Sequence, residues 1–143
     1  ARAASAGSIL VTRLMKRGVS GIVTDGGFRD SSEIADLDFP SFHQKPSAPT
    51  NLTLHQALDI NVPIGCGDVA VFPGDIIVGD NDGVMVIPSE IINEVTQECI
   101  EMTLFEDFVL EQVNKGVTII GLYPPTKEET LQKFEKWKLI KVT

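Results

Sequence analysis

The sequence predicts a mixed α/β domain, and three observations carry that prediction. A short helical pattern near the start of the chain is followed by a buried strand at residues 21–24. Several short β-branched runs, separated by glycine-containing turns, follow between residues 57 and 88. A long helical pattern then extends from Ser89 to about Lys115. With 143 residues, of which 43% are hydrophobic, the chain can bury one core, so we expect a single domain over residues 1–143.

The first helix is expected from about Ala6 to Arg17, with Ser5 as its N-cap. Its first turn contains Gly7 and Ser8, whose small side chains leave backbone N–H groups accessible. A helix N-terminus attracts anions through these amides and through its dipole. A glycine and serine helix start that binds no ligand explains the same residues, and both interpretations stay open.

Residues 21–24 are expected to form a buried strand, and residues 25–27 the glycine turn that leaves it. That turn would present Arg29 and Asp30 side by side. A guanidinium next to a carboxylate can bind an anion and a metal ion together, and glycines let a ligand approach the backbone. Asp30 also precedes Glu33 by three residues, which is the spacing of a capping box. A helix cap and a metal ligand are therefore both open interpretations of Asp30.

The remaining elements are predicted from the spacing of apolar residues and from the positions of proline, glycine and polar residues. Residues 43–53, rich in proline and polar residues, predict a loop. After the long helix we expect one more strand at residues 117–122, then an amphipathic helix from Thr126 that docks through Leu131, Phe134 and Trp137. A compact antiparallel or mixed sheet unit is predicted from the β-branched runs at residues 60–64, 69–72, 76–78 and 84–87.

Composition restricts the class of partner and the compartment. A net charge of -8 and a pI near 4.6 argue against a nucleic-acid partner, because such partners require clustered Lys and Arg. Cys66 and Cys99 lack metal-ligand spacing and are expected to be free thiols of a cytoplasmic protein. No apolar run approaches the roughly 20 residues that cross a bilayer, and no signal peptide opens the chain. We therefore expect a soluble protein without a membrane partner.

Three glycine-containing motifs occur in order along the chain: GVSGIVTDGGFRD at residues 18–30, PIGCG at 63–67 and PGDIIVGDNDGVMVIP at 73–88. Together they resemble the RraA-like family, which contains regulator of ribonuclease activity A and the class II 4-hydroxy-4-methyl-2-oxoglutarate aldolases. The resemblance covers nearly the whole chain. It implies a three-layer β/β/α swivelling-type domain with short strands and a long C-terminal helix, assembled as a homotrimer or a dimer of trimers. It also implies a family segment before Ala1 that this sequence lacks.

The family's enzymes share an acid, twenty intervening residues, Arg-Asp, two residues and a second acid. Arg29, Asp30 and Glu33 match this pattern, whereas Ser8 stands where the first acid would fall. The resemblance implies that Asp30 holds Mg²⁺ or Mn²⁺, partly through water, with Glu33 in the outer layer of the metal site. Arg29 would be catalytic and contact the substrate. The substrate carboxylate would bind the backbone amides of Ser8, Ile9 and Leu10.

These assignments imply a divalent-metal-dependent carbon–carbon lyase for a small 2-oxo acid, such as 4-hydroxy-4-methyl-2-oxoglutarate or oxaloacetate. A 2-oxo acid chelates Mg²⁺ through its carboxylate and keto oxygens. Aldol cleavage and decarboxylation both pass through a pyruvate enolate, which the metal and Arg29 can stabilise. Because Ser8 removes one negative charge from the cation's surroundings, we expect weaker metal binding unless Ser8 holds a metal-bound water.

The resemblance also implies active sites between subunits, with one further acid supplied by a neighbouring subunit. Three glutamates of the long helix are candidates for that acid: Glu98, Glu101 and Glu106. The alternative function is a non-catalytic protein-binding regulator of a ribonuclease. An acidic surface is compatible with such a role.

Overall fold

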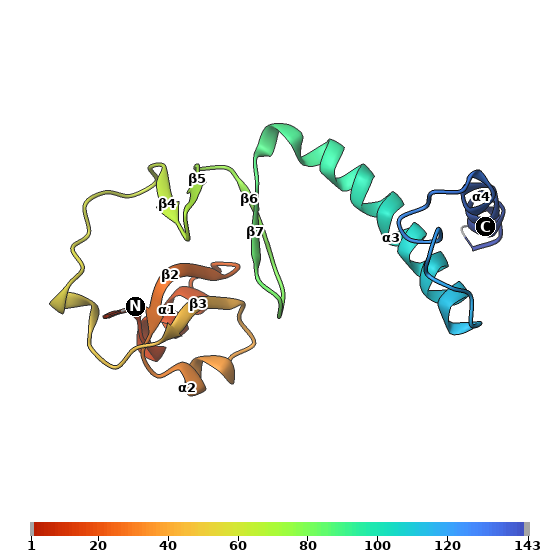
Figure 1. Cartoon of the computed structure of the whole chain (residues 1–143). Coiled ribbons are helices and arrows are strands. Elements are labelled where there is room, and N and C mark those ends of the chain that lie inside the picture. The colour runs from red at the N-terminus through yellow and green to blue at the C-terminus, as the bar shows by residue number, and fades with distance from the viewer. Residues whose placement is uncertain (1, 142–143) are drawn as a thin grey trace. The chain divides into compact units, whose positions relative to one another are not determined.

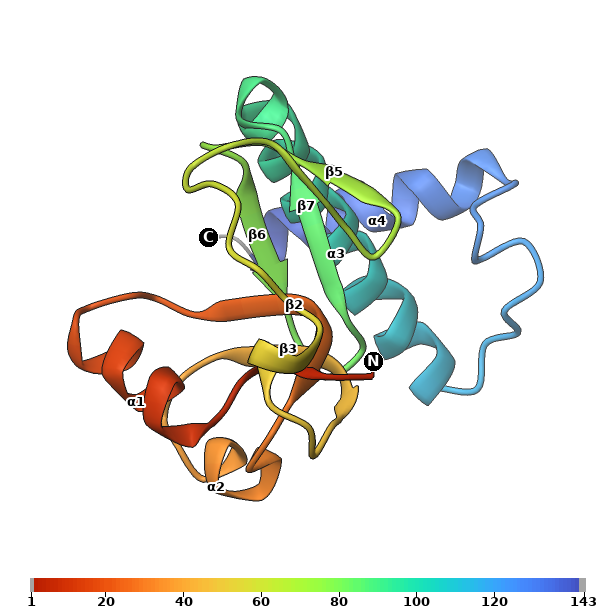
Figure 2. The same cartoon turned by 90° about the vertical axis from the view of Figure 1, so that its left-hand side faces the viewer.

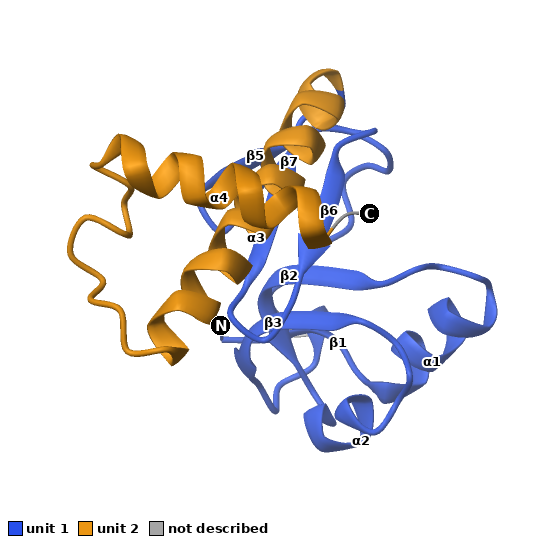
Figure 3. Ribbon diagram, turned by 90° about the vertical axis from the view of Figure 1, so that its right-hand side faces the viewer, with its two compact units in different colours: residues 1–89 blue, residues 90–143 orange. Residues whose placement is uncertain are grey.

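The computed structural model describes residues 2–141 and divides into two compact units, residues 1–89 and residues 90–143 (Figures 1 and 3). Among residues 2–141, the strands all lie in unit 1, and the two long C-terminal helices lie in unit 2. The predicted fold class, a mixed α/β architecture with short strands and a long C-terminal helix, is confirmed. The expectation of a single domain over the whole chain stays a prediction.

A three-stranded parallel sheet lies at the centre of unit 1. Its strands are β1 (Ala4–Ala6), β2 (Ile22–Phe28) and β3 (Ser41–Pro46), with β2 in the middle. The expected glycine turn at residues 25–27 is wrong, because β2 continues through these residues and only shifts register against β3 between Thr24 and Gly27. The expected loop at residues 43–53 is also wrong in its first part, which belongs to β3.

Close packing of β1 against β2 explains why a glycine stands inside the strand. A Cβ atom added at Gly26 would lie 2.2 Å from the Ser5 hydroxyl oxygen. That hydroxyl hydrogen-bonds Thr24 Oγ1 at 2.8 Å across the strand pair. Ser5 therefore belongs to β1 and does not cap the first helix, which corrects the prediction.

Two helices accompany this sheet, α1 (Ser8–Lys16) and α2 (Ser31–Ala35) (Figure 2). Gly7 is the N-cap of α1, and Gly18 follows its end with φ +80°, as its place after two basic residues predicts. The core of unit 1 consists of apolar side chains from the sheet and both helices. Its buried members are Ala6, Val11, Phe28, Ile34 and Phe39.

Two antiparallel hairpins complete unit 1. They pair β4 (Ile64–Cys66) with β5 (Val69–Val71), and β6 (Ile76–Gly79) with β7 (Val84–Ile87). The predicted unit was one antiparallel or mixed sheet; the last three β-branched runs do form antiparallel strands, but in two separate two-stranded sheets. The first run forms a strand only at its end, since Ile60 lies outside any strand and is 88% exposed.

Unit 2 is built on α3 (Ile92–Asn114) and α4 (Glu128–Lys141). Lys115 is the C-cap of α3 and Gly116 follows with φ +85°, so the predicted end of the long helix is confirmed. The predicted strand at residues 117–122 is wrong, because this segment forms turns. An aromatic cluster joins the two helices, with the buried residues Phe108, Val109, Leu122 and Phe134.

No helix in the part of the chain that the structure describes combines the length and the apolar character that crossing a membrane requires. Cys66 and Cys99 are free thiols, as predicted.

Candidate functional site

Asp30 lies directly after β2, where the backbone turns into α2 with φ 56° and ψ 37°. Its carboxylate oxygen Oδ2 accepts a hydrogen bond from the backbone N–H of Ser8 at 3.2 Å and another from the Ser8 hydroxyl at 3.3 Å. Asp30 occupies the N-cap position of α2, yet its side chain makes no capping hydrogen bond. The capping-box interpretation is therefore wrong, and the carboxylate faces the start of α1.

Arg29 lies beside this carboxylate. Its Nε is 3.5 Å from Asp30 Oδ2, and its side chain remains partly exposed. Its backbone N–H donates to the carbonyl of Ala6 at 2.9 Å, which fixes the end of β2 against β1. The structure thus brings the predicted Arg29 and Asp30 together with the first turn of the predicted helix.

The pKa of the Asp30 carboxyl is lowered below its usual value. The hydrogen bond from the Ser8 backbone amide is the largest cause, and the positive charge of Arg29 adds to it. Asp30 is therefore an anion throughout the neutral pH range. It can attract a cation on its free side while Ser8 holds it in place.

Gly7 allows this close approach. A Cβ atom at this position would lie 2.8 Å from Asp30 Oδ2 and 3.5 Å from Arg29 Nε. A distance under 3.0 Å forces a displacement, so any side chain at residue 7 would push the carboxylate away from α1. Glycine is required here for space, since its own φ of -129° is open to other residues.

The first-turn amides of α1 divide into two groups. The amide of Ser8 is bonded to Asp30, whereas those of Ile9 and Leu10 have no hydrogen-bond partner among the described residues. The Ile9 side chain is 84% exposed, so solvent or a ligand reaches this turn. Two of the three predicted anion-binding amides are thus available, and the third holds the acid in position.

A pocket of about 440 Å³ opens beside this turn. Of the predicted site residues, Ile9, Leu10 and Arg29 line it, whereas Ser8, Asp30 and Glu33 do not. Glu33 is exposed on α2. The wall is otherwise formed by small or neutral residues and a second arginine: Ala4, Ala6, Gly7, Arg13, Thr50, Asn51 and Leu52.

Sequence reasoning missed part of this wall. Arg13 follows Ile9 by four residues on α1, so the helical period would have placed both on one face. Residues 50–52 carry no comparable signal. They reach the pocket because the carbonyl of Pro49 accepts a 2.8 Å hydrogen bond from the backbone N–H of Ala4, a contact between distant parts of the chain.

His43 supports strand β2, which ends at Phe28, directly before Arg29. Its Nδ1 accepts the backbone N–H of Phe28 at 3.2 Å. Its ring stacks on the Phe28 ring with centroids 4.8 Å apart.

The described residues offer few side-chain ligands to a metal ion at this site. Among the described residues, no group of three or more His, Cys, Asp or Glu side chains is placed to hold a metal ion. The Asp30 carboxylate lies at the α1 start, where Ser8 holds it. Mg²⁺ keeps several waters and is commonly bound by one or two carboxylates together with ligand oxygens. The residues present therefore fit a cation carried largely by water and by a chelating ligand.

Comparison with known proteins places these residues in a family. A family model described as RraA-like (Aldolase/RraA) matches residues 1–86, which lie within unit 1 and contain the whole pocket. The uncharacterized protein MJ0644 of Methanocaldococcus jannaschii is 39% identical over 102 residues, covering 70% of this chain and 48% of that protein. The "Putative 4-hydroxy-4-methyl-2-oxoglutarate aldolase" of Halalkalibacterium halodurans is 41% identical over 85 residues, covering 59% and 40%.

A solved structure shows the same architecture. The crystal structure of Streptomyces coelicolor RraAS2, described as an unusual member of the RNase ES inhibitor RraA protein family, superposes with a TM-score of 0.71 at 27% identity. The match covers 78% of this chain and 57% of RraAS2. The chain spans about half or less of the length of the curated relatives named above. Because the family model covers more than half of its residues, this chain belongs to the RraA-like family.

Proposed function

We propose that the pocket beside α1 binds a small 2-oxo acid and that the protein is a divalent-metal-dependent carbon–carbon lyase, of the aldolase or oxaloacetate decarboxylase type. One observation carries the proposal. The ionised Asp30 carboxylate lies at the same helix start as the Arg29 guanidinium and the open amides of Ile9 and Leu10. Groups for a cation and for an anion therefore meet at one place, as a chelated 2-oxo acid requires.

In this proposal each group has a separate task. The amides of Ile9 and Leu10 receive the substrate carboxylate at the positive end of the α1 dipole. Asp30 would hold Mg²⁺ or Mn²⁺, which supplies the Lewis acidity that polarises the keto oxygen. Arg29 stabilises the negative charge that develops on that oxygen when the carbon–carbon bond breaks. A water molecule then supplies the proton that C3 takes up, which gives pyruvate.

Ser8 has a supporting task that differs from that of the acid found in related enzymes. Its amide and hydroxyl both hold Asp30 Oδ2, so Ser8 orients the carboxylate. Glu33 would stand in the outer layer of the metal site, as the resemblance implies. The weaker negative field at Ser8 predicts a lower metal affinity than a site with two carboxylates.

We further propose a homotrimer or a dimer of trimers with sites between subunits. Exposed apolar side chains support an assembly. All four residues of β6 are exposed, and Ile9 projects from the pocket into solvent. The acid from a neighbouring subunit would come from one of three α3 glutamates, Glu98, Glu101 or Glu106, of which Glu101 pairs with Lys138 and Glu106 accepts the Tyr123 hydroxyl.

Pyruvate release tests the proposal. The purified chain is mixed with oxaloacetate and Mg²⁺, and pyruvate is measured after subtracting the metal-only rate. We expect turnover that EDTA abolishes and that Mg²⁺ or Mn²⁺ restores. Arg29→Ala should lower the rate about 10²–10³-fold, the usual cost of removing one donor to a developing oxyanion. Arg17→Ala, an exposed arginine outside the pocket, is the matched control and should keep the wild-type rate.

A wild-type rate in Arg29→Ala would remove the catalytic role from this residue. A second candidate function, a regulator that binds a ribonuclease, is favoured by the description of RraAS2 as a member of a ribonuclease inhibitor family. Under that alternative, no 2-oxo acid is turned over with any divalent metal. The chain then recovers a ribonuclease or a helicase in a pull-down.

A further inference from the structure

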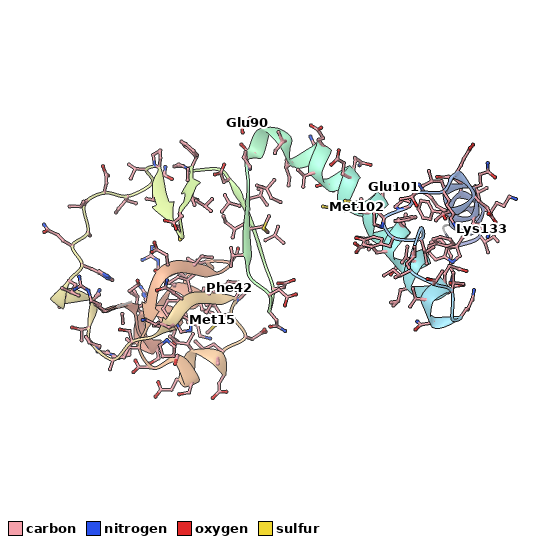
Figure 4. The ribbon with its side chains drawn as sticks, viewed as in Figure 1. Met15, Phe42, Glu90, Glu101, Met102 and Lys133 are labelled. Carbon is pink, nitrogen blue, oxygen red and sulfur yellow. The ribbon has the colours of Figure 1, made fainter. Side chains whose placement is uncertain are left out.

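Unit 2 contains a second pocket, of about 300 Å³, which shares no lining residue with the pocket beside α1. It is lined by α3, by α4 and by the turns that join them. Glu101 and Met102, which lie on the middle of α3, are labelled in Figure 4. The complete wall consists of Glu101, Met102, Phe105, Glu106, Tyr123, Pro125, Leu131, Phe134 and Glu135.

Three aromatic rings line this open pocket. The ring centre of Phe105 lies 5.1 Å from that of Phe134, with the two planes nearly perpendicular at 87°. It lies 6.3 Å from the ring centre of Tyr123, with an interplanar angle of 23°. Phe134 is buried against Phe105, so the accessible ring surface of the wall belongs to Phe105 and Tyr123. Aromatic faces attract cations within about 6 Å of the ring centroid.

The charges of the wall are all negative. Three carboxylates line the pocket, and no lysine or arginine does. Glu106 accepts the hydroxyl of Tyr123 at 2.7 Å, and this contact raises the pKa of Tyr123, so the phenol stays protonated and keeps the carboxylate at the ring. The pocket thus combines aromatic rings with carboxylates, the chemistry that recognises organic cations.

Unit 2 already holds two cations in this way. Lys138 is bonded to Glu101, and its Nζ lies 5.7 Å from the centre of the Phe134 ring. Lys141 repeats the arrangement one turn later, with its Nζ 5.7 Å from the centre of the Trp137 ring and 3.6 Å from a carboxylate oxygen of α3. Each ammonium group therefore interacts with an α3 glutamate and an α4 aromatic ring.

The pocket also combines α3 glutamates with aromatic rings, but its described wall carries no basic residue of its own. One turn before Lys138, α4 carries Glu135 in place of a basic residue, and Glu135 lines the pocket. Glu106, Phe105 and Tyr123 supply the carboxylate and the rings. No described lysine or arginine lines this wall. Lys138 contacts the wall at Glu101 and Phe134, so Phe105, Tyr123 and Glu106 are the part of the wall for which a ligand could supply the cation.

We propose that this pocket binds a small organic cation of the alkylammonium class. Its positive head lies against Phe105 and Tyr123, next to the Glu106 carboxylate, and its alkyl groups contact Met102 and Leu131. The volume of about 300 Å³ is at the lower end of the range for small-molecule sites, which suits a ligand of this size. Every residue that lines this pocket belongs to unit 2, whereas every residue that lines the 2-oxo acid pocket belongs to unit 1.

A matched pair of ligands tests the proposal. The full chain is titrated by NMR with choline and with 3,3-dimethylbutan-1-ol, which replaces the ammonium nitrogen by carbon at nearly the same shape. We expect saturable shifts with choline and at least about tenfold weaker binding of the neutral alcohol, because the cation–π and carboxylate interactions depend on charge. Equal affinity for the two ligands, or no saturation with choline, would overturn the proposal.

Two variants locate the site. Glu106→Gln keeps an acceptor for the Tyr123 hydroxyl while removing the charge, so the fold is retained, and choline affinity should fall at least about threefold. Glu94→Gln removes the same charge from α3 outside the pocket and should bind choline like the wild type. If Glu94→Gln weakens binding as much as Glu106→Gln, the cation is held by the general acidity of α3 and the pocket assignment is wrong.

Discussion

The two units of this chain use charged side chains in opposite ways. In unit 1 the charges of Arg29 and Asp30 meet at one helix start, where backbone and hydroxyl hydrogen bonds fix the carboxylate. In unit 2 the charges are distributed along two helices in exposed pairs, such as Lys115 with Glu111 and Lys133 with Glu129. Exposed pairs of this kind contribute little to stability. In unit 1 the contacts of Arg29 and Asp30 therefore build a candidate binding site, whereas the fold of unit 2 is stabilised mainly by its aromatic core.

The largest expected effect tests the aromatic core. Phe134 is 4% exposed and contacts the rings of Phe105, Phe108 and Trp137, so Phe134→Ala should lower the free energy of unfolding by about 3–5 kcal/mol. Trp137 is the single tryptophan, so urea unfolding followed by its fluorescence reports on unit 2. The control is Phe72→Ala, because Phe72 is 55% exposed. A loss in Phe134→Ala no larger than in the control would contradict the role given to the cluster.

Two carboxylate substitutions, one in each unit, test whether Mg²⁺ binding belongs to unit 1. Asp30→Asn keeps an acceptor for Ser8 but removes the charge, and we expect Mg²⁺ affinity to fall about 10–100-fold. Glu111→Gln removes a carboxylate of unit 2 whose pKa is also lowered, to about 2, and should leave Mg²⁺ affinity unchanged. Calorimetric titration with Mg²⁺ and oxalate measures both. Equal losses would show that the cation responds to overall charge rather than to Asp30.

A substitution at Gly7 is expected to perturb the same site less strongly. Gly7→Ala places a Cβ atom 2.8 Å from Asp30 Oδ2, so we expect a cost of about 1–3 kcal/mol and weaker Mg²⁺ binding. Gly65→Ala is the control, since nothing lies within 4 Å of its added Cβ and its φ is not positive. Thermal unfolding and the calorimetric titration compare the two variants. Identical behaviour would mean that the carboxylate moves aside without consequence.

The smallest expected effect concerns acid stability. Hydrogen bonds from Lys115 first, and from the Trp137 indole second, lower the pKa of Glu111 from 4.5 to about 2. A lowered pKa means that the contribution of Glu111 to stability is fully present above pH 4.5 and is lost as the pH falls through about 2. The melting temperature of Glu111→Gln should therefore fall less than that of the wild type between these pH values. A parallel decline of both proteins would exclude Glu111 as the cause.

The sequence predicted more of the site than of its surroundings. Arg29 and Asp30 are adjacent, so their proximity needs no tertiary information, and the periodicity of α1 and α3 places their apolar faces. The strand β1 has three residues, too few for a period, and its pairing with β2 could not be predicted. Tertiary packing also decided two other points. It extends β2 through glycines that resemble a turn, and it places residues 117–122 in turns despite their β-branched composition.

The role of Asp30 shows what a sequence leaves open. The spacing to Glu33 fits a capping box, and only the contact with Ser8, which lies 22 residues earlier, distinguishes the two interpretations. Arg13 could have been recognised from its helical spacing to Ile9, but residues 50–52 could not, because a long-range hydrogen bond brings them to the pocket.

A crystal structure of the chain grown with Mg²⁺ and oxalate tests the central claim most directly, because oxalate resembles the pyruvate enolate in shape and charge. We expect oxalate between Arg29 and the amides of Ile9 and Leu10, with Mg²⁺ against the Asp30 carboxylate. Oxalate bound outside this pocket, or a well-diffracting crystal in which Asp30 contacts only Ser8 at saturating Mg²⁺ and oxalate, would contradict it.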